Sequence, residues 1–122
     1  MQPEPEDLKY LWDMLDAAKF VVRLTAARTL QEYEDSRELR YSVERAIEII
    51  GEAARRVSAG SRKSHPEIQW NAIVATRHII AHEYGDIQND KIWRIATSHL
   101  PELVELLTPI IERNPPEDGT AG

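Results

Sequence analysis

Apolar residues recur at steps of three and four along most of this chain, which is the spacing of one face of an α-helix. The first run predicts a helix from Asp7 to about Thr29, and it carries two adjacent apolar rows. One row contains Leu8, Leu11, Leu15, Ala18, Val22 and Thr25, and the other contains Tyr10, Met14, Ala17, Val21 and Leu24. Because one neighbouring helix does not need so wide a surface, we expect part of it to meet a second chain.

A second helix is predicted from Arg37 to about Ser58, after residues 31–36 break the pattern and provide a cap at their end. Its apolar stripe is interrupted at Gly51, where glycine costs about 1 kcal/mol relative to alanine. We expect another helix to approach closely at this glycine, although simple tolerance of the glycine is the alternative.

The middle of the chain predicts a basic loop at residues 59–64, followed by a third helix. Ser64-His65-Pro66-Glu67 has the Ser-x-x-Glu spacing of a capping box, with proline in the first turn, and is typical of a helix start. The third helix should then extend to about Ala81 or Tyr84. Its anchors are expected to be Trp70, Ile73, Val74 and Ile80.

Two further helical segments complete the pattern. Gly85-Asp86 should end the third helix and cap the fourth, and Pro101 predicts a kink or short break before the fifth. Residues 114–122 lack large apolar side chains and are expected to be disordered. The pattern therefore predicts one all-α domain over residues 1–113, an antiparallel bundle of about four to five helices.

Composition restricts the kinds of protein that this chain can be. Its 122 residues are enough for one domain and include no cysteine, which excludes disulfides, thiolate zinc sites and thiol nucleophiles. The acidic, proline-containing N-terminus differs from a signal peptide, and no stretch approaches 18 apolar residues. We therefore expect a soluble, cytoplasmic protein that does not span a membrane.

Charge is distributed unevenly along the chain. The formal net charge of −6 argues against a general polyanion-binding surface, yet residues 40–82 carry seven basic and four acidic side chains. Candidates for contact with a nucleic-acid backbone in this region are Arg55, Arg56, Arg62 and Lys63. A solvated helix end followed by a basic loop explains the same residues about equally well.

The residues best suited to catalysis or binding lie between Thr76 and Asp86. Arg77 lies on the apolar side of the predicted third helix, so its guanidinium needs a carboxylate partner or a water-filled cleft where an anion can take that place. His78 and His82 are four residues apart and share a helix face.

Three interpretations of these histidines remain open from the residues alone. The spacing suits a zinc-binding pair, but Glu83 follows the second histidine, so the metalloprotease pattern is absent and we assign no metal. Imidazoles near a helix C-terminus can also cap free carbonyls. The third interpretation is cleavage of RNA, with imidazole taking a proton from a ribose 2′-hydroxyl and guanidinium holding the phosphate, without a metal or cofactor.

These residues resemble the HepT-like family of HEPN-fold proteins. The resemblance rests on Arg77-x4-His82-x-Tyr84, Pro66-Glu67-Ile68-x-Trp70, Ile49-Ile50-Gly51-Glu52-Ala53-Ala54 and Leu100-Pro101-Glu102-Leu103, and it covers nearly the whole chain. It implies a homodimer whose two Arg-x4-His motifs meet in a cleft and act as a metal-independent ribonuclease toxin. It also implies a nucleotidyltransferase antitoxin that binds the toxin and adenylylates the motif tyrosine.

Carried over by position, the resemblance assigns the scissile phosphate to Arg77, proton transfer to His82 and the AMP-accepting hydroxyl to Tyr84. The family usually has asparagine after the arginine, where this chain has His78, so His78 either orients Arg77 or joins the proton transfer. The alternative function is a non-catalytic module that binds a nucleotide or only the nucleotidyltransferase, which the net charge of −6 favours.

Overall fold

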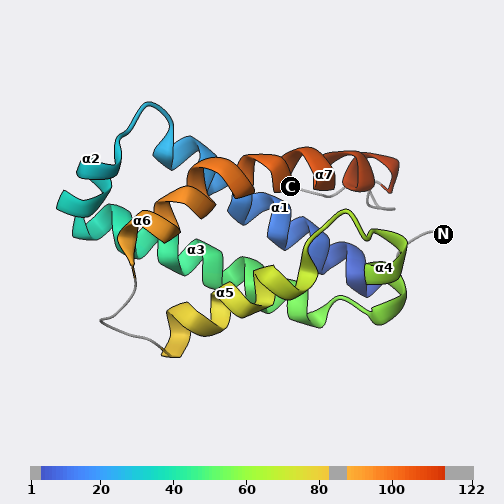
Figure 1. Cartoon of the computed structure of the whole chain (residues 1–122). Coiled ribbons are helices and arrows are strands. Elements are labelled where there is room, and N and C mark those ends of the chain that lie inside the picture. The colour runs from blue at the N-terminus through green and yellow to red at the C-terminus, as the bar shows by residue number, and fades with distance from the viewer. Residues whose placement is uncertain (1–3, 83–87, 115–122) are drawn as a thin grey trace.

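The computed structural model describes residues 4–82 and 88–114, which form an all-α arrangement without β-strands. Its elements are α1 (Pro5–Thr25), α2 (Leu30–Asp35), α3 (Arg37–Arg56), α4 (Ala59–Ser64), α5 (Trp70–His82), α6 (Asn89–Arg94), the π-helical turn η1 (Ile95–His99) and α7 (Leu100–Arg113). Helix α1 packs against both α3 and α7, whereas α5 packs mainly along α3 (Figure 1). The predicted all-α fold is confirmed.

The two apolar rows of α1 are both used within a single chain. Leu11 and Ala18 of one row and Met14 and Val21 of the other are completely buried. Two rows are needed because α1 has two neighbours, α3 and α7. Two helices of the same chain therefore account for much of this apolar surface, and the expected contact with a second chain stays a prediction.

The structure corrects the prediction that residues 31–36 only break the helical pattern. They lie in α2 and its C-cap, because Thr29 and Glu32 form a capping box in which each side chain accepts a hydrogen bond from the other residue's backbone N–H. Burial of Tyr33, which is 0% exposed and lies 5.3 Å from the Trp93 ring, then secures this short helix to α6. The predicted cap before α3 is confirmed, since Ser36 Oγ accepts from the Leu39 N–H at 3.1 Å.

The structure also corrects the predicted basic loop, because residues 59–64 form α4. Ser58 caps this helix by accepting from the Ser61 N–H. The buried carboxylate of Asp7, at the start of α1, accepts hydrogen bonds from Ser58 N (2.9 Å), Ser58 Oγ (2.6 Å) and Ser61 Oγ (2.6 Å). This contact explains why α4 lies beside the N-terminal end of α1 (Figure 1).

The predicted helix start at residues 64–67 is wrong, because α5 begins at Trp70. Trp70 is buried, and its indole Nε1–H donates to the carbonyl oxygen of His65 at 3.0 Å. That bond holds residues 65–69 as a turn across the end of α5, with Ile68 buried beneath it. The tryptophan contact thus prevails over the local capping pattern.

The kink or short break predicted near Pro101 is not a break in the structure, where the helix changes type instead. The chain stays helical from α6 to α7, but η1 precedes the proline, which lies in the first turn of α7. Proline has no N–H to donate, and the π-helical turn shifts the backbone hydrogen-bond pattern just before it. Ala96 and Leu100 are buried on either side of this shift.

Some predictions fall on residues 83–87 and 115–122, which are outside the described residues. They include the helix stop at Gly85-Asp86, most of the predicted disordered tail and the environment of Tyr84. Within the described part of the chain, no helix is long and apolar enough to cross a membrane.

Candidate functional site

Helices α3 and α5 approach each other closely where Gly51 faces Arg77. A Cβ added to Gly51 would lie 2.2 Å from Arg77 Cβ, 2.8 Å from Arg77 Cγ and 3.2 Å from the carbonyl oxygen of Ile73. No side chain larger than hydrogen fits this space without a movement of one helix. The expected close approach at Gly51 is therefore confirmed, and it fixes the first two side-chain carbons of Arg77 against α3.

Arg77 extends from this contact to the edge of a cleft. Its side chain is 33% exposed, and its Nη2 lies 3.5 Å from Glu52 Oε2 on α3. The cleft has a volume of about 300 Å³ and lies between α1, α3 and α5, where Lys9, Tyr10 and Arg56 also line it. The structure thus supplies both of the environments expected for Arg77, a carboxylate partner and an open cleft.

Glu52 holds three guanidinium groups at once. Its Oε1 accepts from Arg55 Nη2 at 2.8 Å and from Arg56 Nε at 3.1 Å, in addition to the contact with Arg77. Hydrogen bonds from Arg55 and Arg56 lower the pKa of Glu52 to about 2. The carboxylate is therefore ionised at neutral pH, and three cations on one anion leave the cluster positive.

The two motif histidines lie together on the exposed side of α5. The His78 and His82 rings have centroids 4.3 Å apart with an interplanar angle of 46°, and both residues are exposed. His78 lines a shallow depression with Arg55 and Arg62, on a different side of α5 from the cleft that Arg77 lines. One protomer therefore brings the histidines together but does not place them in the cleft with Arg77. Tyr84 is outside the described residues.

The four cations proposed for a nucleic-acid backbone line three different hollows of the surface, although Arg55 and Arg56 meet at Glu52. Arg56 lines the cleft with Arg77, whereas Arg55 and Arg62 line the depression with His78. The Arg62 guanidinium donates to the carbonyl oxygens of Ala54, Arg55 and Val57 and so caps the C-terminal end of α3. Lys63 is exposed and lines a third depression with Arg62.

Sequence reasoning did not find Lys9, Tyr10 and Arg45, which also line the cleft. They come from the first turns of α1 and the middle of α3. No spacing within the sequence relates them to Arg77, because only the packing of α1, α3 and α5 brings them together. Glu52 gave a partial signal, since it lies next to the glycine expected to contact another helix.

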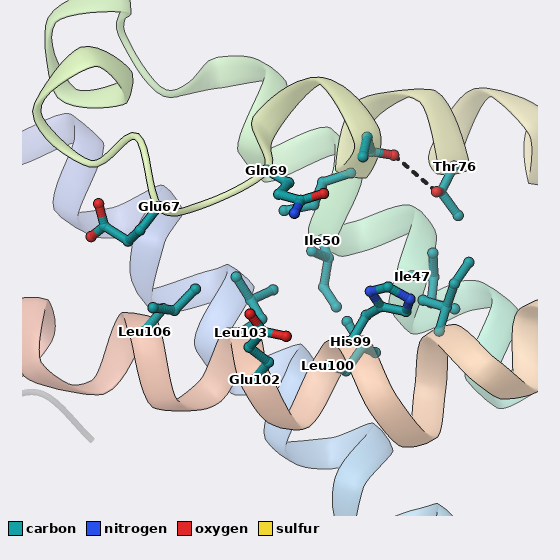
Figure 2. Close-up of a pocket in the computed structure, with 13 residues that line it drawn as sticks. Ile47, Ile50, Glu67, Gln69, Thr76, His99, Leu100, Glu102, Leu103 and Leu106 are labelled. Atoms are coloured by element: carbon teal, nitrogen blue, oxygen red, sulfur yellow. Dashed lines mark hydrogen bonds between the residues drawn. The ribbon is translucent and has the colours of Figure 1, made fainter.

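A separate apolar cavity lies between α5 and α7. It has a volume of about 190 Å³ and is bounded by α3, α5, η1 and α7 (Figure 2). Ile47, Ile50, Leu100 and Leu103 line its interior, and Thr76 of α5 and His99 of η1 lie at its polar edge. Thr76 directly precedes Arg77 and Ile73 lies one turn before it, so this cavity borders the same helix that carries the motif.

Comparison with known proteins identifies the family. The family described as "Ribonuclease HepT-like" matches residues 14–110, which is most of the chain. The chain belongs to the HepT-like ribonuclease family.

Relatives across most of the chain have names that agree with this family. A Methanocaldococcus jannaschii protein named "Putative RNase MJ1380" is 33% identical over 94 residues, covering 77% of this chain and 86% of the relative. A Thermococcus cleftensis protein named "Probable ribonuclease HepT" is 27% identical over 94 residues, with the same coverage of 77% and 86%. No solved structure matches. Membership in the HepT-like family supports a ribonuclease function and an RNA substrate for this chain.

Proposed function

We propose that this HepT-like protein is a metal-independent endoribonuclease toxin that acts as a homodimer. The observation that supports this most directly is the arrangement on α5, where Arg77 reaches a cleft and the exposed His78–His82 pair lies on another side of the same helix. One protomer offers a phosphate-binding guanidinium and a proton-transfer group that do not converge. Two copies related by a twofold axis would let the Arg77 of one protomer and the His82 of the other address the same phosphodiester.

The proposed reaction is attack of a ribose 2′-oxygen on its own 3′-phosphate. His82 of one protomer takes the 2′-hydroxyl proton, the new P–O2′ bond forms, and the P–O5′ bond breaks. The leaving 5′-oxygen receives a proton from the motif of the second protomer, so the products are a 2′,3′-cyclic phosphate and a 5′-hydroxyl. Arg77 binds the non-bridging oxygens and stabilises the charge that develops on them.

Regulation by a nucleotidyltransferase antitoxin is part of this proposal. Tyr84 lies two residues after His82 in the sequence, and AMP on its hydroxyl would add bulk and negative charge to the motif. The added phosphate would compete with RNA for nearby guanidinium groups. Of the basic candidates, Arg56 is the one that lines the cleft together with Arg77, and we assign it to the RNA backbone.

The experiment is cleavage of end-labelled RNA by purified protein in EDTA. We expect products with 2′,3′-cyclic phosphate ends, and His82→Ala should lower the rate by a factor of about 10² to 10⁴, the usual contribution of a general acid or base. His99→Ala is the matched control, because His99 is exposed on η1 and outside the motif. Cleavage by His82→Ala at the parent rate would refute the proposed chemistry.

The alternative function is a non-catalytic module that the nucleotidyltransferase modifies. The net charge of −6 favours it, since a general RNA-degrading enzyme is more commonly neutral or basic. Absence of RNA cleavage, together with a mass increase of one AMP on Tyr84 after incubation with the nucleotidyltransferase, would support this alternative over the enzyme.

A further inference from the structure

Arg77 is held at both ends of its side chain by two consecutive residues of α3. Gly51 lies against Arg77 Cβ and Cγ, and Glu52 lies 3.5 Å from its guanidinium. A long, flexible arginine side chain ordinarily occupies many rotamers in solvent, and ordering it costs free energy. Contacts at the stem and at the head reduce that freedom before any substrate binds.

The three cations on Glu52 are not held equally. The contacts with Arg55 and Arg56 measure 2.8 and 3.1 Å, whereas the Arg77 contact measures 3.5 Å. Arg77 therefore has the longest of the three contacts. If Arg77 turns to a phosphate, Arg55 and Arg56 still pair with Glu52, so the carboxylate is not left without a counter-ion.

We propose that Glu52 is a positioning residue that aims the Arg77 guanidinium at the cleft and releases it to the phosphodiester. This inference rests on the proposed function, because Arg77 acts there on the scissile phosphate. Glu52 does not contact the substrate. It orients Arg77, which does contact the substrate. When Arg77 moves from the carboxylate to the phosphate, Arg55 and Arg56 remain bound to Glu52, so this carboxylate is not left unpaired.

The test compares Glu52→Gln with Glu48→Gln. Glu48 lies one turn earlier on α3 and lines the same cleft, and its side chain is 31% exposed against 32% for Glu52. It pairs with Arg45 at 3.6 Å instead of Arg77, so Glu48→Gln removes the same charge from the cleft without removing a contact of Arg77. Ion pairs between partly exposed side chains at the surface contribute little to stability, so both variants should fold with parent-like melting temperatures.

The expected result is a split between kcat and KM. In Glu52→Gln the kcat for a short RNA should fall at least tenfold, because Arg77 is no longer aimed. Its KM should stay unchanged or decrease, because a competing negative charge is gone. Glu48→Gln should retain kcat within about twofold. Equal kcat values for the two variants would overturn the inference.

A second measurement separates this inference from the proposed function. In ¹⁵N-labelled protein, the Arg77 Nε–H signal, assigned by its disappearance in Arg77→Lys, should exchange faster with water in Glu52→Gln than in Glu48→Gln. This readout needs no RNA. If the protein does not cleave RNA, or if Arg77→Lys cleaves at the parent rate, the proposed function fails while the NMR comparison still decides whether Glu52 holds Arg77. An unchanged Arg77 signal in Glu52→Gln would refute the positioning role.

Discussion

Replacement of Gly51 by alanine tests the packing that places Arg77. In an open helix this change would stabilise the protein by about 1 kcal/mol through helix propensity. Here the new Cβ would lie 2.2 Å from Arg77 Cβ, while non-bonded carbons settle at about 3.5–4.0 Å, so α5 must move by about 1.5 Å. Two of the opposing atoms, Arg77 Cβ and the Ile73 carbonyl oxygen, are fixed to the backbone of α5 and cannot rotate away.

The expected magnitude follows from these two opposing effects. Overpacking of this kind costs about 1–3 kcal/mol, and the immobile neighbours favour the upper end. After the gain in helix propensity is subtracted, Gly51→Ala should destabilise the protein by about 2 kcal/mol, which lowers the melting temperature by about 8 °C for a domain of this size. Displacement of Arg77 by about 1 Å should also reduce RNA cleavage about 10²-fold.

The assay is urea unfolding followed by circular dichroism, with Gly60→Ala as the matched control. Gly60 is also helical, but a Cβ there meets only Ser58 Oγ at 4.0 Å, so this variant should gain up to about 1 kcal/mol. The two substitutions should therefore change the free energy of unfolding in opposite directions, with a difference of about 3 kcal/mol between the two variants. Equal stabilities for Gly51→Ala and Gly60→Ala would show that α3 and α5 do not meet as closely as described.

Three further predictions concern polar groups away from the motif. Burial raises the pKa of Asp7, but its hydrogen bonds with serines lower it more, so the net pKa is below the ordinary value. The stabilisation that the ionised Asp7 carboxylate gives the folded protein is therefore complete above pH 4 and is lost as the pH falls through the lowered pKa. Asp7→Asn should lower the free energy of unfolding by about 1–3 kcal/mol at pH 7, and it should flatten the dependence of urea stability on pH at acid pH. Tyr33→Phe should be neutral or stabilising by up to about 1 kcal/mol in thermal unfolding, because no described residue forms a hydrogen bond with the buried Tyr33 hydroxyl. Arg62→Ala should lose about 1–3 kcal/mol in thermal unfolding because it uncaps α3, whereas Lys63→Ala, on an exposed side chain, should change stability by less than about 0.5 kcal/mol.

Each of these predictions has a result that would contradict it. An Asp7→Asn profile with the parent's dependence on acid would mean that this carboxylate does not bind the serines in the folded protein. A loss of more than about 1 kcal/mol in Tyr33→Phe would reveal a partner for its hydroxyl. Equal effects of Arg62→Ala and Lys63→Ala would remove the capping role of Arg62.

The long helices could be predicted from sequence because each carries its own periodic apolar face. The ends predicted for α1 and α3 lie within a few residues of the observed ones. The short helices α2 and α4 were missed because six residues give too little periodicity. Their stability depends on distant contacts, namely Trp93 against Tyr33 and Asp7 against Ser61.

The site was predictable in its residues and less so in its geometry. The position of Arg77 on an apolar helix side indicated a carboxylate partner or a water-filled cleft, and Gly51 indicated the helix contact. Neither pattern identified Glu52 as the shared carboxylate, because it lies 25 positions before Arg77 on another helix. The roles given to His82 and Tyr84 came from the family resemblance and stay predictions.

The dependence of α5 on α3 has a consequence for how the molecule opens. The apolar cavity also lies along α5, which buries fewer of its residues than α1 or α3 do. Trp70 and Ile80 are its buried residues. Helices with little buried surface open first in native-state amide exchange, because local opening costs them less free energy. The backbone amides of α5 should therefore lose protection before those of α1 and α3, by a local transition that leaves the rest of the fold intact and temporarily withdraws the motif arginine from its place beside Gly51.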